Sequence, residues 1–382
     1  MTGPFDDKLA QAEVEGRLRR LRTFESPQGC SAVLDGRKVV LFSSNDYLGL
    51  RIHPAVTRAV VDCARRYGWG AGAARLMAGG MAPHTDLETA IARFLDKDAA
   101  LLFGSGFAAN TGTLTALMGR GDHVFADKLV HASVIDGARH SGARLVRFAH
   151  NDPSSLEDSL KNAPASGKRL VVTEGLFSMD GDVSPVKDIA RIARENGAMM
   201  MVDDAHGFGV AGPEGRGTVH RAGTQDMVDI HVVTLGKAFG GFGGLVTASA
   251  KVIEGLTNFA RPFIYSTALP PAAAAAGLAA LEIVKGEEGQ VRRGRLMQNT
   301  ARVADILRRE GYPGDWGSQI IPVMTGESGA AVALSSQLLE RGVFAPAIRP
   351  PTVPEGFARL RLSVTSEHTE GDMDALRRAL AR

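Results

Sequence analysis

The sequence predicts an α/β protein with a large domain, built on a mostly parallel sheet covered by helices, and a smaller C-terminal α/β domain. Apolar runs of strand length each end in a loop with Gly, Asp or Ser, and helical patterns such as residues 186–196 lie between them. Because these runs are continuously apolar, they are typical of parallel strands buried on both faces. A length of 382 residues also exceeds what one hydrophobic core usually supports. The runs are residues 99–103, 169–173, 198–202 and 230–234.

Three parts follow one another along the chain. Residues 1–45 hold a basic stretch that we expect to be helical, residues 46–285 form the large domain, and residues 286–382 form the small one. An Ala-rich run at 272–284 is too short to span a membrane, so we expect a buried helix there. The expected strands outside the large domain are a hairpin-like stretch at 32–42 and the runs 320–324, 343–348 and 358–364.

Charge and cysteine content argue against several classes of protein. Lys and Arg number 44 against 42 for Asp and Glu, and this balance argues against a broad nucleic-acid or membrane surface, so we expect neither partner. The two cysteines, Cys30 and Cys63, fit a reducing compartment and stand in no metal-ligand spacing. The polar segment 1–8 lacks a signal-peptide pattern. We therefore expect a cytoplasmic protein without a bound metal.

A lysine, Lys237, closely follows the apolar run 230–234. Lysine is costly to bury, and a desolvated lysine with a lowered pKa is a good imine-forming nucleophile. Four glycines within residues 240–244 would let the backbone approach a flat ligand. On this motif alone, Lys237 is either such a nucleophile or a solvated loop lysine.

The run 198–202 leads directly into Asp203, Asp204 and His206. A carboxylate at the end of a buried strand can pair with a pyridinium nitrogen and keep it protonated, which makes the ring an electron sink. We expect Asp203 in this position and Asp204 pointing to the other side. His206 would hydrogen-bond the phenolic oxygen of the ring, or else it is a structural histidine with satisfied hydrogen bonds.

Residues 104–110, Gly-Ser-Gly-Phe-Ala-Ala-Asn, lie between a strand and a helix. Such a turn presents backbone N–H groups and the positive end of a helix dipole to an anion, so it is a natural phosphate site. The turn also matches a dinucleotide fingerprint, which makes a nicotinamide-dependent oxidoreductase a second interpretation. A further match at 207–212 runs into Pro213, where a dinucleotide-binding unit needs a helix.

Several motifs together resemble the alpha-oxoamine synthases over nearly the whole chain. These synthases have the type I pyridoxal 5'-phosphate (PLP) aminotransferase fold and act as homodimers. The resemblance therefore implies that fold, PLP as the cofactor and a homodimer. The motifs, in the order and spacing of the family, are Asn45–Leu50, Gly104–Asn110, His131–Ser133, Glu174–Asp182, Asp203–Gly207 and Thr234–Lys237.

The resemblance also implies a role for each residue of the cofactor site. Lys237 would form the Schiff base with PLP, Asp203 would pair with the pyridine nitrogen, His131 would stack on the ring, and His206 would contact the phenolic oxygen. These four residues are the expected catalytic groups. The other expected contacts are Ser178 at the phenolic oxygen and, at the phosphate, Gly106, Phe107, Thr234 and, from the other subunit, Thr267.

Substrate contacts follow from the same resemblance. Arg361 would bind the substrate carboxylate in a bidentate pair, which suits a guanidinium. Residues 348–354 and 359–361 are similar to the branch of the family that condenses L-alanine with pimeloyl-CoA or pimeloyl-acyl carrier protein in biotin synthesis. Arg19 would contact this substrate, or else it lies on a solvated basic helix face or meets the thioester phosphates. The other expected substrate contacts are Asn45, His131 and Thr352.

Residues 70–75, Gly-Ala-Gly-Ala-Ala-Arg, depart from the Gly-Ser-Gly-Gly-Ser-Arg that is commoner in the family. The change removes expected hydroxyl contacts and puts the substrate pocket in doubt. Two further interpretations therefore stay open. One is a sister synthase that uses glycine or serine with another acyl-CoA, and the other is a non-catalytic PLP-binding protein.

Overall fold

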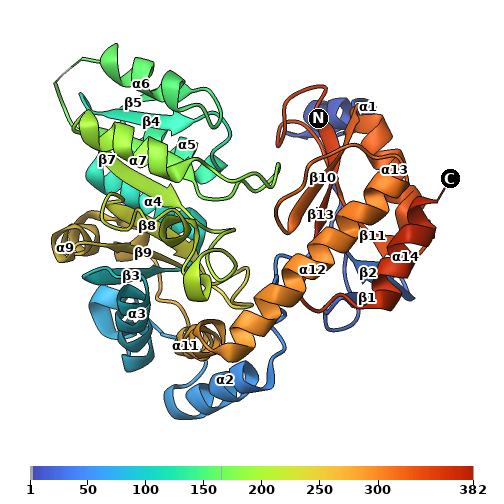
Figure 1. The fold of residues 1–382 in the computed structure, drawn as a ribbon. Coiled ribbons are helices and arrows are strands. Elements are labelled where there is room, and N and C mark those ends of the chain that lie inside the picture. The colour runs from blue at the N-terminus through green and yellow to red at the C-terminus, as the bar shows by residue number, and fades with distance from the viewer. Residues whose placement is uncertain (1–2, 165, 382) are drawn as a thin grey trace. The chain divides into compact units, whose positions relative to one another are not determined.

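The computed structural model of the chain describes residues 3–164 and 166–381 (Figure 1). Contacts between residues divide the chain into two compact units. The domain boundaries that we expect after residues 45 and 285 remain predictions. The large unit comprises Leu48–Ser178 and Val183–Arg293, and the small unit comprises the chain up to Tyr47, Met179–Asp182 and the chain from Gly294 onward.

A seven-stranded sheet with the strand order β3-β9-β8-β7-β6-β4-β5 forms the centre of the large unit. Strand β9 runs antiparallel to both of its neighbours, and the other strands of this sheet share one direction. The mostly parallel sheet is thus confirmed, with all four of the strands that the sequence predicts for it. The strands are β3 (Ala99–Phe103), β4 (His123–Asp127), β5 (Arg144–Phe148), β6 (Arg169–Glu174), β7 (Met199–Asp203), β8 (Ile230–Thr234) and β9 (Gly244–Ala248).

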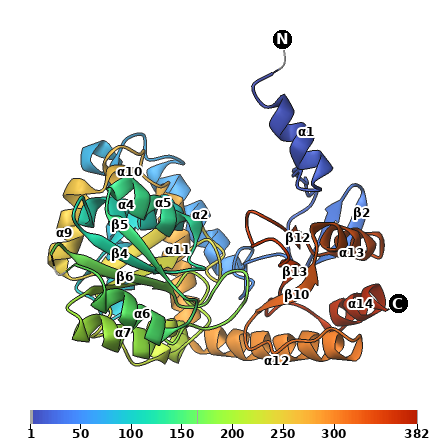
Figure 2. The same cartoon turned by 90° about the horizontal axis from the view of Figure 1, so that it is seen from above.

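Side chains alternate between two hydrophobic cores, one on each face of this sheet. Val124 and Ala126 of β4 lie in one core, and Phe125 between them lies in the other. This double burial explains why the strands are continuously apolar. Figure 2 shows α4, α5 and α10 on one side of the sheet and α6 and α7 on the opposite side. The helices of the first face are α4 (Gly106–Leu117), α5 (Ala132–Ser141), α9 (Ala250–Phe259) and α10 (Arg261–Ile264), and those of the second are α6 (Pro153–Lys161), α7 (Val186–Glu195) and α8 (Thr218–Arg221).

The Ala-rich run forms α11 (Pro271–Lys285), a largely buried helix as predicted. It packs against α2 (Pro54–Tyr67) and α3 (Ala82–Phe94). Within α11, a Cβ on Gly277 would lie 3.0 Å from a methyl group of Leu235. The unit also contains short helical segments at Arg75–Gly79 and Pro213–Gly215, each interrupted by a residue with non-helical backbone angles, Met77 and Glu214.

The small unit contains two three-stranded sheets, with the orders β1-β2-β11 and β10-β13-β12. The predicted hairpin is confirmed, since β1 and β2 pair antiparallel. The predicted strand 343–348 is instead two short strands, β11 and β12, that belong to different sheets. The strands are β1 (Ser31–Leu34), β2 (Arg37–Leu41), β10 (Ile320–Gly326), β11 (Val343–Phe344), β12 (Ala347–Ile348) and β13 (Ala358–Ser363), and the helices lying wholly within the unit are α1 (Asp6–Val14), α13 (Ser328–Glu340) and α14 (Glu370–Leu380).

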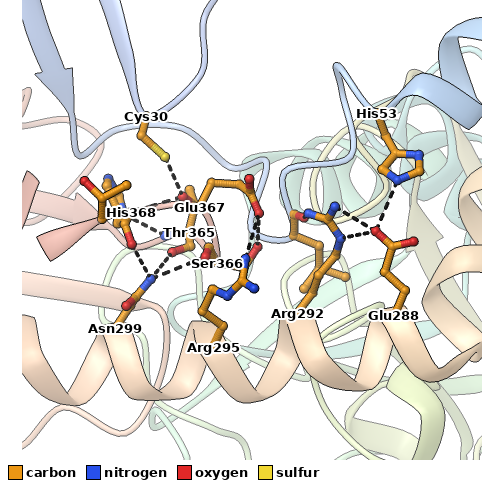
Figure 3. A network of polar contacts seen from close by, with 12 residues as sticks. Cys30, His53, Glu288, Arg292, Arg295, Asn299, Thr365, Ser366, Glu367 and His368 are labelled. Carbon is orange, nitrogen blue, oxygen red and sulfur yellow. Dashed lines mark hydrogen bonds and ion pairs between the residues drawn. The ribbon is translucent and has the colours of Figure 1, made fainter.

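Helix α12 (Glu287–Arg309) begins in the large unit and ends in the small one. In each unit, polar side chains of the helix form hydrogen bonds with neighbouring segments (Figure 3). In the large unit, Arg292 pairs with Glu288 at 2.8 Å and donates to the carbonyl of Leu48 at 2.8 Å. In the small unit, Asn299 donates to the carbonyls of Thr365 and His368, each at 3.0 Å. Among the described residues, none of the helices combines the length and apolar character that a membrane span requires.

Candidate active site

A cavity of about 160 Å³ lies in the large unit, where β6, β7 and β8 end. Ligands of open parallel sheets bind beyond the carboxyl ends of the strands, so this is the expected place for a site. The last residue of each strand faces the cavity: Glu174 of β6, Asp203 of β7 and Thr234 of β8. The cavity is lined by Gly106, Phe107, Asn110, His131, Glu174, Ser178, Asp203, Ala205, His206, Thr234 and Lys237.

Hydrogen bonds fix the carboxylate of Asp203, which is 6% exposed. Its Oδ2 accepts from Asn110 Nδ2 at 2.6 Å, and its Oδ1 accepts from the backbone N–H of Ala205 at 3.1 Å. The Asn110 amide also donates to Ser133 Oγ at 2.9 Å. These two donors hold the Asp203 carboxyl group in one orientation, which suits it to a cationic partner.

The side chains of Lys237 and His206 meet at the cavity, with Lys237 Nζ 2.6 Å from His206 Nε2. Lys237 follows β8 in a turn in which Gly240 donates its N–H to the Lys237 carbonyl at 2.8 Å. Gly240 has a φ of 61°, and a Cβ there would lie 2.2 Å from the backbone nitrogen of Arg51. The turn therefore requires glycine at this position.

His131 stands at the N-terminal end of α5, and its Nδ1 accepts from the backbone N–H of Ser133 at 3.3 Å. The edge of its ring meets Phe107, with 6.3 Å between ring centroids and an interplanar angle of 82°. Surrounding protein atoms desolvate the ring and lower its pKa, an effect that Asp203 opposes and Lys237 reinforces. A neutral imidazole offers a flat face for stacking on another ring.

The turn from β3 to α4 approaches Thr234 closely. Ser105 caps α4, since its Oγ accepts from the Ala108 N–H at 3.0 Å. A Cβ on Gly244 would lie 2.6 Å from the nitrogen of Gly106, so the two backbones can pack only without a side chain there. First-turn N–H groups of a helix lack acceptors within the helix, and together with the dipole they favour an anion.

Sequence reasoning assigns no role to Asn110 or Glu174, yet both line the cavity. Glu174 is only 3% exposed and takes part in hydrogen bonds from the backbone N–H groups of His131 and Ser178. The sequence does carry a signal for both residues, because Asn110 ends one family motif, Gly104–Asn110, and Glu174 begins another, Glu174–Asp182. What the sequence lacks is the register that sets Glu174 opposite Asp203.

Thr267 does not belong to the residues that line this cavity in its own chain. It forms an isolated antiparallel bridge with Ala74, and its neighbours Tyr265 and Ser266 are exposed. A contact of Thr267 with a cofactor phosphate therefore stays a prediction that depends on a second subunit.

Arg361 and Asn45 lie together in the small unit. Arg361, in β13, donates to Ser363 Oγ at 2.6 Å, to Asn45 Oδ1 at 3.2 Å and to the Tyr47 hydroxyl at 3.4 Å. These three partners are neutral oxygen atoms, which orient the cation. Burial raises the pKa of Tyr47 against the opposing effect of Arg361, so the phenol stays protonated.

Arg19 also lies in the small unit, and its Nη2 donates to the Thr352 hydroxyl at 3.4 Å. The structure thus brings together two residues that the sequence analysis assigns to the acyl substrate. The expectation that Arg19 lies on a basic helix is wrong. Helix α1 ends at Val14, and Gly16 with a φ of 63° turns the chain out of the helix before the arginines.

A family model, aminotransferase class I and II, matches residues 37–380. The chain belongs to this family. It is 47% identical over 384 residues to an 8-amino-7-oxononanoate synthase of Geobacter sulfurreducens, a match that covers 100% of this chain and 98% of the relative. Membership confirms the predicted fold and argues against the dinucleotide-binding interpretation.

Solved structures of the same fold agree with this membership. A serine palmitoyltransferase of S. paucimobilis with a bound PLP-myriocin aldimine has a TM-score of 0.94 and 29% identity, covering 98% of this chain and 96% of that one. An 8-amino-7-oxononanoate synthase of Francisella tularensis has a TM-score of 0.76 and 31% identity, covering 90% of this chain and 97% of that one. Both structures have the fold that the sequence motifs predict.

Proposed function

We propose that this protein is a PLP-dependent 8-amino-7-oxononanoate synthase of biotin biosynthesis. It condenses L-alanine with a pimeloyl thioester and releases carbon dioxide and the free thiol. The observation that carries the proposal is the cavity in which Asp203, Lys237 and His131 meet. Full-length similarity to 8-amino-7-oxononanoate synthases, at 47% identity in one case, supports the substrate pair.

The residues around the cavity fit three of the polar groups of PLP. Lys237 supplies an amine for the aldehyde, Asp203 a fixed carboxylate for the pyridine nitrogen, and the turn at Gly106 with the Thr234 hydroxyl an anion site for the phosphate. The Oδ1 atom of Asn110 is buried without a partner among the described residues, so the cavity offers a hydrogen-bond acceptor that a bound ligand could use. Bound PLP supplies an electron sink for a carbanion formed at the substrate α-carbon.

Proton transfer in this reaction falls to Lys237. An amine beside the substrate α-carbon is a suitable general base once it is unprotonated. The His206 ring at 2.6 Å can take a hydrogen bond from Lys237 Nζ and so orients the amine. Asp203 would hold the pyridine nitrogen of bound PLP in its protonated form, and two hydrogen bonds keep the Asp203 carboxylate in place for this role.

Substrate recognition is assigned to the small unit. Arg361 is 7% exposed and held by neutral oxygen atoms, which suits it to pair with the carboxylate of alanine. Arg19 and Thr352 are assigned to the acyl thioester. We place the enzyme in the cytoplasm as a homodimer, in which Thr267 of one subunit completes the phosphate site of the other.

A sister synthase is the second candidate, because the serine palmitoyltransferase structure has the higher TM-score of the two solved relatives. The two candidates differ in the acyl chain. A pimeloyl chain ends in a polar group, and a site built for it would be left unpaired by a plain fatty acyl chain. One methyl group distinguishes alanine from glycine, which is worth only about 1–3 kcal/mol in an apolar pocket.

The test combines a spectrum with a substrate panel. Purified protein should show the visible absorbance of bound PLP, and this absorbance should change on adding L-alanine. Acetyl-, succinyl-, palmitoyl- and pimeloyl-thioesters, as CoA and acyl-carrier-protein forms, are then each paired with glycine, alanine and serine while thiol release is followed. The highest kcat/KM is expected for alanine with a pimeloyl thioester. A higher kcat/KM for acetyl-CoA with glycine would show that the protein is a sister synthase and not the synthase proposed here.

A further inference from the structure

We propose that Glu174 is a positioning residue that works as a neutral carboxylic acid. One of its oxygen atoms accepts hydrogen bonds from the backbone at His131 and Ser178. Because Glu174 keeps its proton, the negative charge of the two neighbouring carboxyl groups resides on Asp203. The inference rests on the proposed function, because Asp203 is the residue assigned to the PLP nitrogen. It concerns a side chain that is not among the site residues expected from the sequence.

Two carboxyl groups face the cavity from neighbouring strands. Glu174 ends β6 and Asp203 ends β7, and the two residues are partners in the parallel register. Adjacent strands lie about 4.8 Å apart, so paired side chains are close neighbours. Both residues are buried, at 3% and 6% exposure. Two carboxylates that share a buried site do not both ionise readily, and one of them retains a proton.

Hydrogen bonds indicate which of the two keeps the proton. Asp203 has a donor on each oxygen, Asn110 Nδ2 on Oδ2 and the Ala205 N–H on Oδ1. On Glu174, Oε1 is buried and has no partner among the described residues, so the N–H groups of His131 and Ser178 serve Oε2. An ionised oxygen without a donor is costly to bury, whereas a protonated one carries no charge. The proton therefore belongs on Glu174.

The electrostatic surroundings agree with this assignment. Burial and then the charge of Asp203 raise the pKa of Glu174 well above its usual value, while Lys237 and the two backbone N–H groups oppose the shift. The groups that face Glu174 are thus Asp203 from β7, Lys237 from the turn after β8, and the start of α5 at His131. The opposing groups do not outweigh burial, so the net shift favours the protonated acid.

Glu174 connects two backbone segments that line the cavity. His131 precedes α5, and Ser178 belongs to the segment after β6. Through hydrogen bonds to the backbone of both residues, Oε2 links two separate segments of the cavity lining to one side chain. Because both bonds are donated by backbone, they fix the chain itself rather than a rotatable side chain. An acceptor oxygen at this point is required, whereas a negative charge is not.

Glutamine is the matched substitution, since it keeps an acceptor oxygen and replaces the acid O–H by an amide. For Glu174→Ala we expect PLP to bind at least about tenfold more weakly, because two backbone hydrogen bonds are lost. For Glu174→Gln we expect most of that affinity to return. Equal weakening in the two variants would show that the charge matters and would overturn the proposal, as would failure of Glu174→Gln to fold.

Infrared spectroscopy reads the proton directly on the full-length protein in D2O. The difference between wild type and Glu174→Gln at neutral pD should contain a carboxylic-acid C=O band above the amide I region. Glu88→Gln is the control, because Glu88 is buried in the same unit but pairs with Arg75 at 2.8 Å and should give no acid band. This band is measured with or without PLP, so a protein that fails to bind PLP refutes the proposed function separately. Absence of the band from the wild-type spectrum would overturn the neutral-acid proposal.

Discussion

Replacing Asp204 by alanine should destabilise the protein strongly, even though its neighbour Asp203 is the residue assigned to chemistry. The Asp204 side chain is fully buried. Its Oδ2 accepts from the Thr218 N–H at 2.6 Å and from His231 Nε2 at 3.1 Å, and its Oδ1 accepts from the Thr218 hydroxyl at 2.8 Å. Asp204→Ala leaves these three donors without an acceptor.

The size of the effect follows from those donors and from the packing around them. Three glycines, Gly175, Gly207 and Gly217, approach so closely that a Cβ on any of them would lie within 2.4 Å of an Asp204 oxygen. These three neighbours have no side chain that could fill the space or replace the acceptor. Breaking a buried charged network costs about 3–5 kcal/mol of unfolding free energy. The average unfolding entropy per residue corresponds to about 1.2 °C per kcal/mol for a chain of this size, so the thermal midpoint should fall by roughly 4–6 °C.

Thermal unfolding followed by circular dichroism at one fixed scan rate measures this shift. Asp203→Asn is the matched control, because the Asn110 amide can rotate and offer its oxygen, which has no partner among the described residues, to the new amide. That variant should melt within about 2 °C of wild type, in the range of substitutions that leave no buried donor unpaired. If Asp204→Ala also melted within that range, the network would not stabilise the fold as reasoned.

Four further outcomes are expected. Lys237→Ala should abolish turnover in a folded protein, and borohydride should no longer fix PLP to the chain; covalent PLP in the variant would place the anchor elsewhere. Asp203→Asn should lose most activity because a neutral amide does not stabilise a protonated pyridine, and near-normal turnover would remove its assigned role. Mixing inactive Lys237→Ala chains with an inactive Thr267 variant should restore some activity in hybrid dimers, whereas full activity in an isolated monomer would contradict a shared site. Burial lowers the pKa of His84 and His368, and the Nδ1 of each accepts a backbone N–H. The unfolded chain therefore takes up protons first, and the thermal midpoint should fall as the pH drops below about 6.5; a flat profile from pH 8 to pH 5 would refute this.

The central sheet was largely predictable because its inner strands are continuous apolar runs. Strands β6, β7 and β8 were found in this way, and the side chains that end or follow them, such as Asp203 and Lys237, lie at the cavity. Three other strands of the sheet, β4, β5 and β9, were not predicted, and two of them lack a long apolar run. Strand β5 (Arg144–Phe148) lies at an edge of the sheet and carries two arginines, and β9 (Gly244–Ala248) is built largely from small residues.

Local conformation limited the predictions elsewhere. A glycine at position 16 ends α1 before the arginines, and nothing in the basic pattern marks that turn. The roles of Asn110 and Glu174 depend on strand register and on contacts between segments far apart in sequence. A single sequence does not contain that register, so motifs locate the site more readily than they reveal how its residues support one another.

The pairing of β3 with β9 has a consequence for how the protein is made. Residue 103 pairs with residue 244, so β3 leaves the ribosome long before the strand that holds it in the sheet. Until β9 is synthesised, β3 and β8 both lack that neighbour, and unpaired strand edges are prone to aggregation. Gly244 also packs against Gly106, which begins the proposed phosphate turn. Long-range pairing of this kind forms slowly, and the nascent chain therefore acquires its capacity to hold PLP only at a late stage of folding.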